Sequence, residues 1–175
     1  MLKFACMGTG EYFRKGTAYL ASHGYEQVFD PDLLICLAHP EILPQSTLDK
    51  YPLGCINFHA GLPKYRGRHP LQWMLIDGLP EIPIAVHQID GGIDTGPIIV
   101  QDKVSVGRDE TYASALEKVT DAVGPLLVRA IARIAANEPA EPQDKAQLGY
   151  VPRRTPEDSK IDFNLPGERV HRFIN

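Results

Sequence analysis

The chain has 175 residues, of which 43% are hydrophobic and 23% are charged, and its formal net charge is −4 at pH 7. This length suits one domain with a sizeable core and leaves little room for two. The acidic balance argues against a surface built mainly to bind nucleic acid. No apolar run reaches the roughly 20 residues of a membrane span, so no membrane partner is expected.

Apolar runs alternate with amphipathic segments along the first half of the chain. The opening run ends in Gly8-Thr9-Gly10 and precedes an amphipathic stretch that Gly24 closes, which predicts a strand, a tight turn and a helix. The next run is apolar on both faces, as in an interior parallel strand. The expected strands are Leu2–Met7, Asp32–Leu37 and Gly54–Phe58, and the expected helices are Phe13–Ser22, Pro44–Lys50 and His69–Ile76.

The second half continues this alternation. Strands are expected over Ile82–Gln88 and Ile98–Val106, on either side of a glycine-rich loop. A long helix is expected over 110–136, where apolar residues recur every three or four positions. Strands that alternate with helices predict a three-layer α/β domain with a mainly parallel sheet, in which ligands bind at the carboxyl ends of the strands.

The proline-rich segment over 138–143 is expected to interrupt regular structure. The chain is therefore predicted to comprise a domain over residues 1–142 and an irregular arm over 143–175. A helical turn is expected near the end of the arm, at 170–174.

The three cysteines, Cys6, Cys36 and Cys55, are scattered through apolar segments and are expected to be buried, reduced thiols. They form no metal-ligand spacing with the histidines, so no metal is expected. The first residues lack the charged, apolar and small-residue order of a signal peptide. A cytoplasmic location is expected.

Two glycine-rich loops carry the side chains on which the functional prediction depends. Asn57 and His59 lie two positions apart at a strand end, so their side chains can point to the same side. Asn57 offers an amide donor to a developing oxyanion, and a protonated His59 adds a second donor and a positive charge. Asp94, on the second loop, can pair with that charge or accept a proton from an attacking amine. Together they suit acyl transfer. Alone, Asn57 is more often a turn former, Asp94 is often a capping or turn residue, and a single histidine at a strand end is more often not catalytic.

Two other segments are candidate anion sites. Gly8-Thr9-Gly10 opens a helix, so its backbone N–H groups could hold an anionic group, and a tight turn without a ligand is the equal alternative. Lys64, Arg66 and Arg68 form a basic cluster beyond His59 that could clamp a phosphate or pyrophosphate. The alternative for this cluster is a solvated turn.

In these motifs the chain resembles the formyltransferases that use 10-formyltetrahydrofolate, a family that includes enzymes acting on methionyl-tRNA and on nucleotide-linked amino sugars. The family pattern Asn-x-His, Leu-Pro and Tyr-Arg-Gly-Arg is matched over 57–68, and Asp-x-Gly-Ile-Asp-Thr-Gly is matched over 90–96. The family has more chain between the first helix and the strand at Asp32, and its tRNA and sugar enzymes continue past the position of Asn175 into a small β domain. A shortened N-terminal half and an absent β domain are therefore expected.

The resemblance implies a Rossmann-like formyltransferase domain with 10-formyltetrahydrofolate as co-substrate and Asn57, His59 and Asp94 as catalytic residues. The folate contacts that it implies are His39, Glu41, Ile42, Leu43, Asp90, Gly91 and Gly92. The acceptor contacts are expected at Gly8, Thr9, Gly10, Lys64, Arg66 and Arg68.

The expected acceptor is the primary amine of a nucleotide-linked amino sugar, because the Asn-Phe-His-Ala-Gly variant and the Arg-Gly-Arg-His-Pro loop are closest to that branch. A methionyl-tRNA formyltransferase is the second interpretation, and hydrolysis of formyl-folate by water is the third. A peptide or carrier-bound amine is a further possible acceptor, and a homodimer is a possible assembly. A catalytically silent folate-binding remnant is the alternative from outside the enzyme class.

Overall fold

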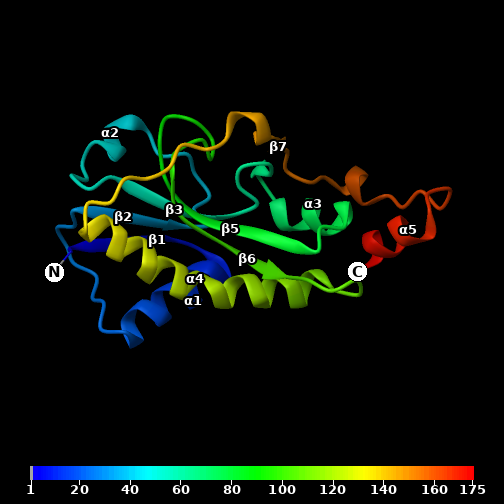
Figure 1. Cartoon of the computed structure of the whole chain (residues 1–175), viewed down its shortest axis with the longest axis horizontal. Coiled ribbons are helices and arrows are strands. Elements are labelled where there is room, and N and C mark those ends of the chain that lie inside the picture. The colour runs from blue at the N-terminus through cyan, green and yellow to red at the C-terminus, as the bar shows by residue number, and fades with distance from the viewer. Residues whose placement is uncertain (1) are drawn as a thin grey trace.

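A five-stranded sheet forms the centre of the structure, a computed structural model that describes residues 2–175 (Figure 1). The sheet order is β1-β2-β3-β5-β6, and the strands are β1 (Phe4–Gly8), β2 (Leu33–Leu37), β3 (Cys55–Ala60), β5 (Glu81–Gln88) and β6 (Ile98–Ser105). The first three are parallel, whereas β5 is antiparallel to both β3 and β6. Only β5 is thus reversed, and the prediction of a mainly parallel sheet is confirmed.

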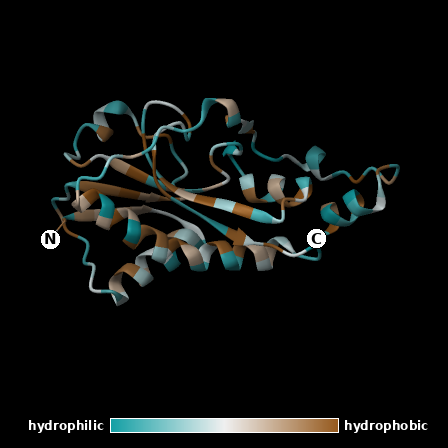
Figure 2. Ribbon diagram, viewed as in Figure 1, coloured by the Kyte–Doolittle hydropathy of each residue, from teal (hydrophilic) through white to brown (hydrophobic). Residues whose placement is uncertain are grey.

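Helices cover both faces of this sheet. In Figure 1, α1 (Gly10–Ser22) and α4 (Tyr112–Ala135) lie below it, and α2 (Gln45–Leu48) and α3 (Pro70–Asp77) lie above it. Successive residues of a strand point to opposite faces of the sheet. Because helices cover both faces, all five residues of β2 are buried. Its Leu33, Ile35 and Leu37 belong to the main core with α1 and α4, while Leu34 and Cys36 pack with α2. Figure 2 shows the resulting brown, hydrophobic centre of the sheet.

Glycine residues allow close packing of α1 and α4, the two helices below the sheet. A Cβ atom added at Gly124 in α4 would lie 2.2 Å from Cγ of Tyr19 in α1. Gly16 of α1 is equally confined, since its added Cβ would lie 2.9 Å from Cδ1 of Leu37. α4 begins with a capping box in which Thr111 and Ser114 satisfy each other's backbone N–H groups.

Most predicted elements match the structure to within a few residues, with two differences that concern the site. β3 continues through His59 to Ala60, so His59 lies within the strand instead of following it. The short strands β4 (Arg66–Gly67) and β7 (Tyr150–Val151), which the sequence did not predict, pair in parallel. This ladder joins the arm to the loop that follows β3, and the arm ends in α5 (Gly167–Ile174), which is longer than the predicted turn.

All three cysteine side chains are free thiols. Cys36 and Cys55 are buried as expected, whereas Cys6 is partly exposed. Burial raises the pKa of the thiols of Cys6 and Cys36 to about 12 and that of Cys55 to about 11, so all three are protonated near neutral pH.

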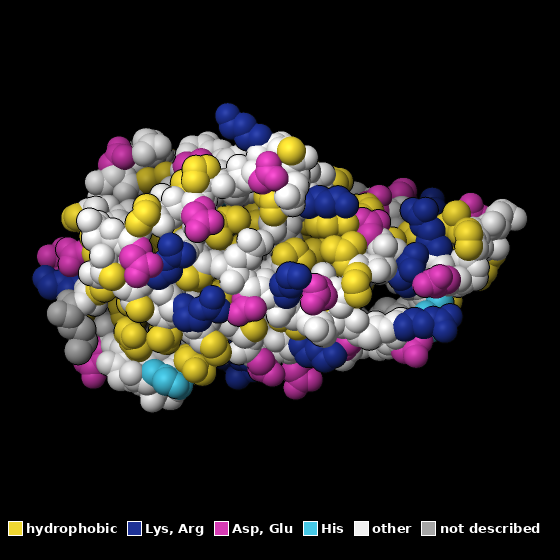
Figure 3. Space-filling view, viewed as in Figure 1, with side chains coloured by type: hydrophobic (Ala, Val, Ile, Leu, Met, Phe, Trp, Pro, Cys, Tyr) yellow, Lys and Arg dark blue, Asp and Glu magenta, His cyan; other side chains and the backbone are white. Residues whose placement is uncertain are grey.

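Two further observations concern the length of the helices and the charges on the surface. Over residues 2–175, every helix is too short or too polar to cross a bilayer. On the face shown in Figure 3, Lys and Arg side chains are interspersed with Asp and Glu side chains.

Candidate active site

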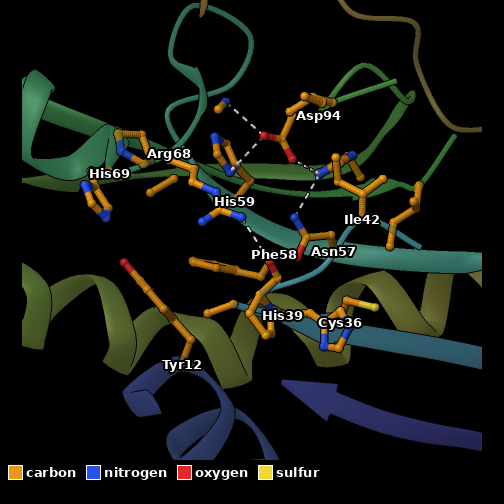
Figure 4. Close-up of a pocket in the computed structure, with 18 of the residues that line it drawn as sticks. Tyr12, Cys36, His39, Ile42, Asn57, Phe58, His59, Arg68, His69 and Asp94 are labelled. Carbon is orange, nitrogen blue, oxygen red and sulfur yellow. Dashed lines mark hydrogen bonds and ion pairs between the residues drawn. The ribbon is translucent and has the colours of Figure 1, made fainter. Parts of the chain in front are cut away.

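A cavity of about 470 Å³ lies beside the end of β2 and the second half of β3. The loop over residues 89–97 covers it, but this loop leaves the reversed strand β5 near Cys55, whose carbonyl accepts the N–H of Ile89 at 2.7 Å. It then folds back along β3 to bring Asp94 over His59 (Figure 4). The two key loops therefore meet through this reversal, and not at the ends of two parallel strands.

Backbone strain marks the same cavity. Ala38, His69 and Asp94 have φ angles of 52°, 59° and 53°, in the left-handed region that disfavours residues with a Cβ atom. All three line the cavity, and the only other described non-glycine residue with positive φ is Asn137. Strained conformations of this kind concentrate at ligand and catalytic sites, because the surrounding structure must hold them in place.

The structure brings the three predicted catalytic residues together. Asp94 Oδ2 accepts the backbone N–H of Gly67 at 3.0 Å and lies 3.7 Å from Nδ1 of His59. The other ring nitrogen, Nε2, is 2.9 Å from the carbonyl oxygen of Tyr65 and therefore carries a hydrogen. Asp94 is thus placed to stabilise a positive charge on the His59 ring. The Tyr65 carbonyl sets the tautomer of that ring, and Asn57 lies beside His59 on β3 (Figure 4).

A second histidine, which the sequence reasoning missed, completes this cluster. Nε2 of His87 lies 3.3 Å from Nδ2 of Asn57 and 3.6 Å from Oδ1 of Asp94. Its Nδ1 is 2.8 Å from the carbonyl oxygen of Gln88, so Nδ1 carries the hydrogen and Nε2 accepts one from Asn57. One Asn57 hydrogen is thereby engaged, and the second remains for a ligand. His87 stands opposite Asn57 in the antiparallel register, a pairing that strand patterns alone do not reveal.

His87 is neutral near physiological pH. Its burial, at 2% exposure, and to a smaller extent the neighbouring His59 lower the pKa of its imidazole to about 4, and Asp94 opposes this shift. An unfolded histidine titrates near 6.5, so between that pH and about 4 the unfolded chain binds a proton that the native protein does not.

We expect His87 to make the protein less stable as the pH falls through this window. One extra proton on the unfolded chain lowers the free energy of unfolding by up to about 1.4 kcal/mol per pH unit. Urea unfolding of the parent and of His87→Gln between pH 7 and pH 4 measures the effect. The stability difference between the two proteins should shift in favour of the variant as the pH falls, and a constant difference would contradict the assignment.

The other predicted site residues divide into two groups. Those that line the cavity are His39, Glu41, Ile42, Leu43, Asp90, Gly92 and Arg68. The remaining ones, Gly8, Thr9, Gly10, Gly91, Lys64 and Arg66, are not part of its wall as described.

Several residues that do not line the cavity make contacts elsewhere in the structure. Thr9 bonds the end of β2 through its N–H to Leu37 and its hydroxyl to Ala38. Arg66 donates from Nε to the carbonyl of Gly149 at 2.9 Å, which ties it to the arm. Lys64 lies over the ring of Tyr65.

Three tyrosines also line the cavity, and the sequence reasoning assigned none of them to the site. Tyr12 comes from α1, Tyr112 from the start of α4 and Tyr150 from β7. Each belongs to an amphipathic or irregular segment in which an aromatic residue is more simply read as core. Among the described residues, no three His, Cys, Asp or Glu side chains gather as metal ligands do.

Both the sequence and the fold match known proteins. Residues 14–131 match the family model described as formyl transferase. The chain is 38% identical over 147 residues to a methionyl-tRNA formyltransferase from Kosmotoga olearia, a match that covers 82% of this chain and 47% of that relative. The chain thus spans about half the length of the curated relatives that it matches.

Solved structures share the fold. HypX from Aquifex aeolicus in complex with tetrahydrofolic acid superposes with a TM-score of 0.84 at 18% identity, over 99% of this chain and 34% of that chain. An N-formyltransferase from Helicobacter canadensis in complex with folinic acid and dTDP-3-aminofucose gives a TM-score of 0.80 at 18% identity, over 99% of this chain and 80% of that chain.

Proposed function

The chain belongs to the formyl transferase family, and from this premise we propose that it transfers the formyl group of 10-formyltetrahydrofolate to a primary amine. The observation that carries the proposal is the clustering of the buried His59 with the partly buried Asn57 and Asp94 on the wall of the cavity. The chain needs no serine or cysteine nucleophile for this reaction, since an amine attacks a formyl carbon directly.

The attack forms a carbon–nitrogen bond and places negative charge on the formyl oxygen. The free hydrogen of the Asn57 amide and the charged ring of His59 are the donors for this oxygen. His87 positions Asn57 by accepting the other hydrogen of its amide. Nδ1 is the ring nitrogen of His59 that can turn toward the oxyanion, because it lies 3.7 Å from Asp94, beyond hydrogen-bond distance, whereas Nε2 is bonded to the Tyr65 carbonyl.

The attacking amine must lose a proton as the tetrahedral intermediate forms. The Asp94 carboxylate accepts it, directly or through one water molecule, and His59 remains charged beside it. Collapse of the intermediate breaks the bond to N10 of the folate, and the proton held by Asp94 passes to N10, directly or through water, as tetrahydrofolate leaves. The products are the formamide and tetrahydrofolate, so atoms and charge balance.

The size and lining of the cavity fit a folate at one end. A volume of about 470 Å³ falls within the usual range for a small-molecule site. Ile42, Leu43 and Ile93 supply apolar walls for a flat ring, while Glu41 and Asp90 supply acceptors for its N–H groups. These residues follow β2 and β5 along the chain.

For the acceptor we favour a nucleotide-linked amino sugar. Among the residues that line the cavity, Arg68 provides a cation for phosphate, and Tyr12, Tyr112 and Tyr150 provide rings for a base or sugar. The net charge of −4 offers little attraction to a tRNA. Methionyl-tRNA is the second candidate, and the 38% identity to a methionyl-tRNA formyltransferase supports it.

The test is release of tetrahydrofolate from 10-formyltetrahydrofolate, with a panel of nucleotide-linked amino sugars, with methionyl-tRNA and with no amine. Amine-dependent release that disappears in His59→Ala would support the transferase and identify its acceptor. Release without an amine would replace the proposal with a hydrolase. Folate binding without release under any condition would favour the silent remnant and contradict the proposal.

Two neighbouring arginines should behave differently. Arg68→Ala should raise the KM for the acceptor about tenfold, because a lost charge-assisted hydrogen bond costs at least about 1.4 kcal/mol. Arg66→Ala should leave that KM within about twofold and lower the melting temperature, because Arg66 bonds the arm at Gly149 and not the cavity. Steady-state kinetics and thermal unfolding measure both, and equal rises in KM would contradict the separate roles.

A further inference from the structure

The side chain of Gln143, the first residue of the arm, binds the loop that carries Asp94. Its Nε2 donates to the carbonyl oxygen of Asp94 and to that of Gly96, each at 2.8 Å. A primary amide nitrogen has two hydrogens, so both are used on this loop. Gln143 is 8% exposed, and it lines a second cavity and not the cavity of the active site as described.

The orientation of this amide follows from the two carbonyls. A reversed amide would place its oxygen against two carbonyl oxygens, which repel it. In the observed orientation the Oε1 atom of Gln143 is buried and has no hydrogen-bond partner in the part of the chain that the structure describes. Both N–H groups of the Gln143 amide therefore bind the loop, while its carbonyl oxygen has no hydrogen-bond partner among the described residues.

Hydrogen bonds within the loop over 89–97 fix only part of its backbone. The Asp90 carboxylate accepts the N–H of Gly92 at 3.0 Å and the hydroxyl of Thr95 at 2.5 Å. Asp94 itself has the left-handed φ of 53°, and a Cβ added at Gly96 would lie 1.9 Å from the carbonyl oxygen of Gln88. The end of the loop is therefore confined between β5 on one side and Gln143 on the other.

Gln143 is in turn held by a fixed piece of backbone. Two residues earlier, Glu141 pairs with Ile98 at the start of β6 through two hydrogen bonds of 2.7 and 2.8 Å. The amide therefore approaches the loop from a position set by the sheet.

We propose that Gln143 is a positioning residue for formyl transfer, which keeps the Asp94 carboxylate directed at His59 by holding the backbone of the loop from behind. The inference rests on the proposed function. Gln143 is not part of the wall of the active-site cavity as described, so its effect on the reaction passes through Asp94. Displacement of a reacting group by about 1 Å can lower a rate by up to about a hundredfold.

The first test is the kinetics of Gln143→Met, which keeps the side-chain length and removes both donors. We expect kcat for amine-dependent release of tetrahydrofolate to fall about tenfold to a hundredfold, with the KM for 10-formyltetrahydrofolate within about twofold. Gln101→Met is the matched control, because Gln101 lines the same second cavity and donates to the Leu62 carbonyl at 3.2 Å. A parental kcat in Gln143→Met, or an equal loss in both variants, would overturn the proposal.

Hydrogen exchange of the backbone amides over 91–96 provides a test that does not depend on activity. These amides should exchange at least about tenfold faster in Gln143→Met than in the parent or in Gln101→Met, while those of β4 and β7 stay unchanged. Unchanged exchange of the loop would overturn the proposal. If the parent transfers formyl to no amine, the proposed function fails, and with it the catalytic role of Gln143, whereas the exchange result still decides whether Gln143 holds the loop.

Discussion

Asp94→Asn is expected to lower amine-dependent formyl transfer by roughly 10²–10⁴-fold while the protein stays folded. Asparagine accepts no proton from the attacking amine and places no negative charge beside His59, which Asp94 faces at 3.7 Å. The fold should tolerate the change for two reasons. Asparagine readily adopts the left-handed conformation seen at Asp94, with its φ of 53°, and its oxygen can still accept the N–H of Gly67.

The measurement is the rate of tetrahydrofolate release under saturating folate and amine, together with the melting temperature. Asp102→Asn is the control for the same chemical change, since Asp102 pairs with Arg129 on the exposed side of β6, away from the cavity. Activity of Asp94→Asn within a few-fold of the parent would show that Asp94 is not the proton acceptor.

His59→Ala is expected to have the second large effect, a loss of roughly 10²–10⁴-fold in transfer. It removes the charged donor for the oxyanion, and it also leaves the Tyr65 carbonyl, now bonded at 2.9 Å, without a partner. Since an unpaired buried acceptor costs about 1–3 kcal/mol, the variant should also be less stable. Loss of activity in this variant alone would therefore have two explanations.

His59→Gln separates them. Its amide can donate to the Tyr65 carbonyl but carries no positive charge and exchanges no proton. We expect urea unfolding to show stability closer to the parent than that of His59→Ala, while transfer remains as low. Substantial recovery of transfer in His59→Gln would mean that His59 serves the reaction only by supporting the local structure.

The candidate site was partly predictable because its central motifs are contiguous. Asn57 and His59 share one strand, and a period of two residues is enough to place them on one side. Asp94 was predictable from its glycine-rich loop and from the family resemblance. His87 was not, because its contact with Asn57 depends on the antiparallel register of β3 and β5. Gln143 was not, because it reaches Asp94 across 49 residues of chain.

The predicted acceptor contacts show the same division between local and distant information. Lys64, Arg66 and Arg68 form one basic cluster in the sequence, but only Arg68 is part of the cavity wall as described. Residues two apart would share one side of a regular strand, but Gly67, with a φ of 106°, interrupts the extended geometry between Arg66 and Arg68. The pairing of β4 with β7 then brings Arg66 against Gly149 of the arm. The sequence showed the positive charges of this cluster. Which side chain faces the cavity depended on the pairing of β4 with β7, which the sequence did not predict.

The amino-acid sequence by itself determined the order of the strands and helices of the α/β domain, the family and the three residues that we propose as catalytic. These depend on local periodicity and on short motifs, which neighbouring residues encode. The tertiary structure alone decided the reversal of β5, the neutral His87 beside Asn57 and the hold of Gln143 on the loop of Asp94. Each depends on register or on contact between distant segments, which packing of the whole domain selects and no short stretch of sequence specifies.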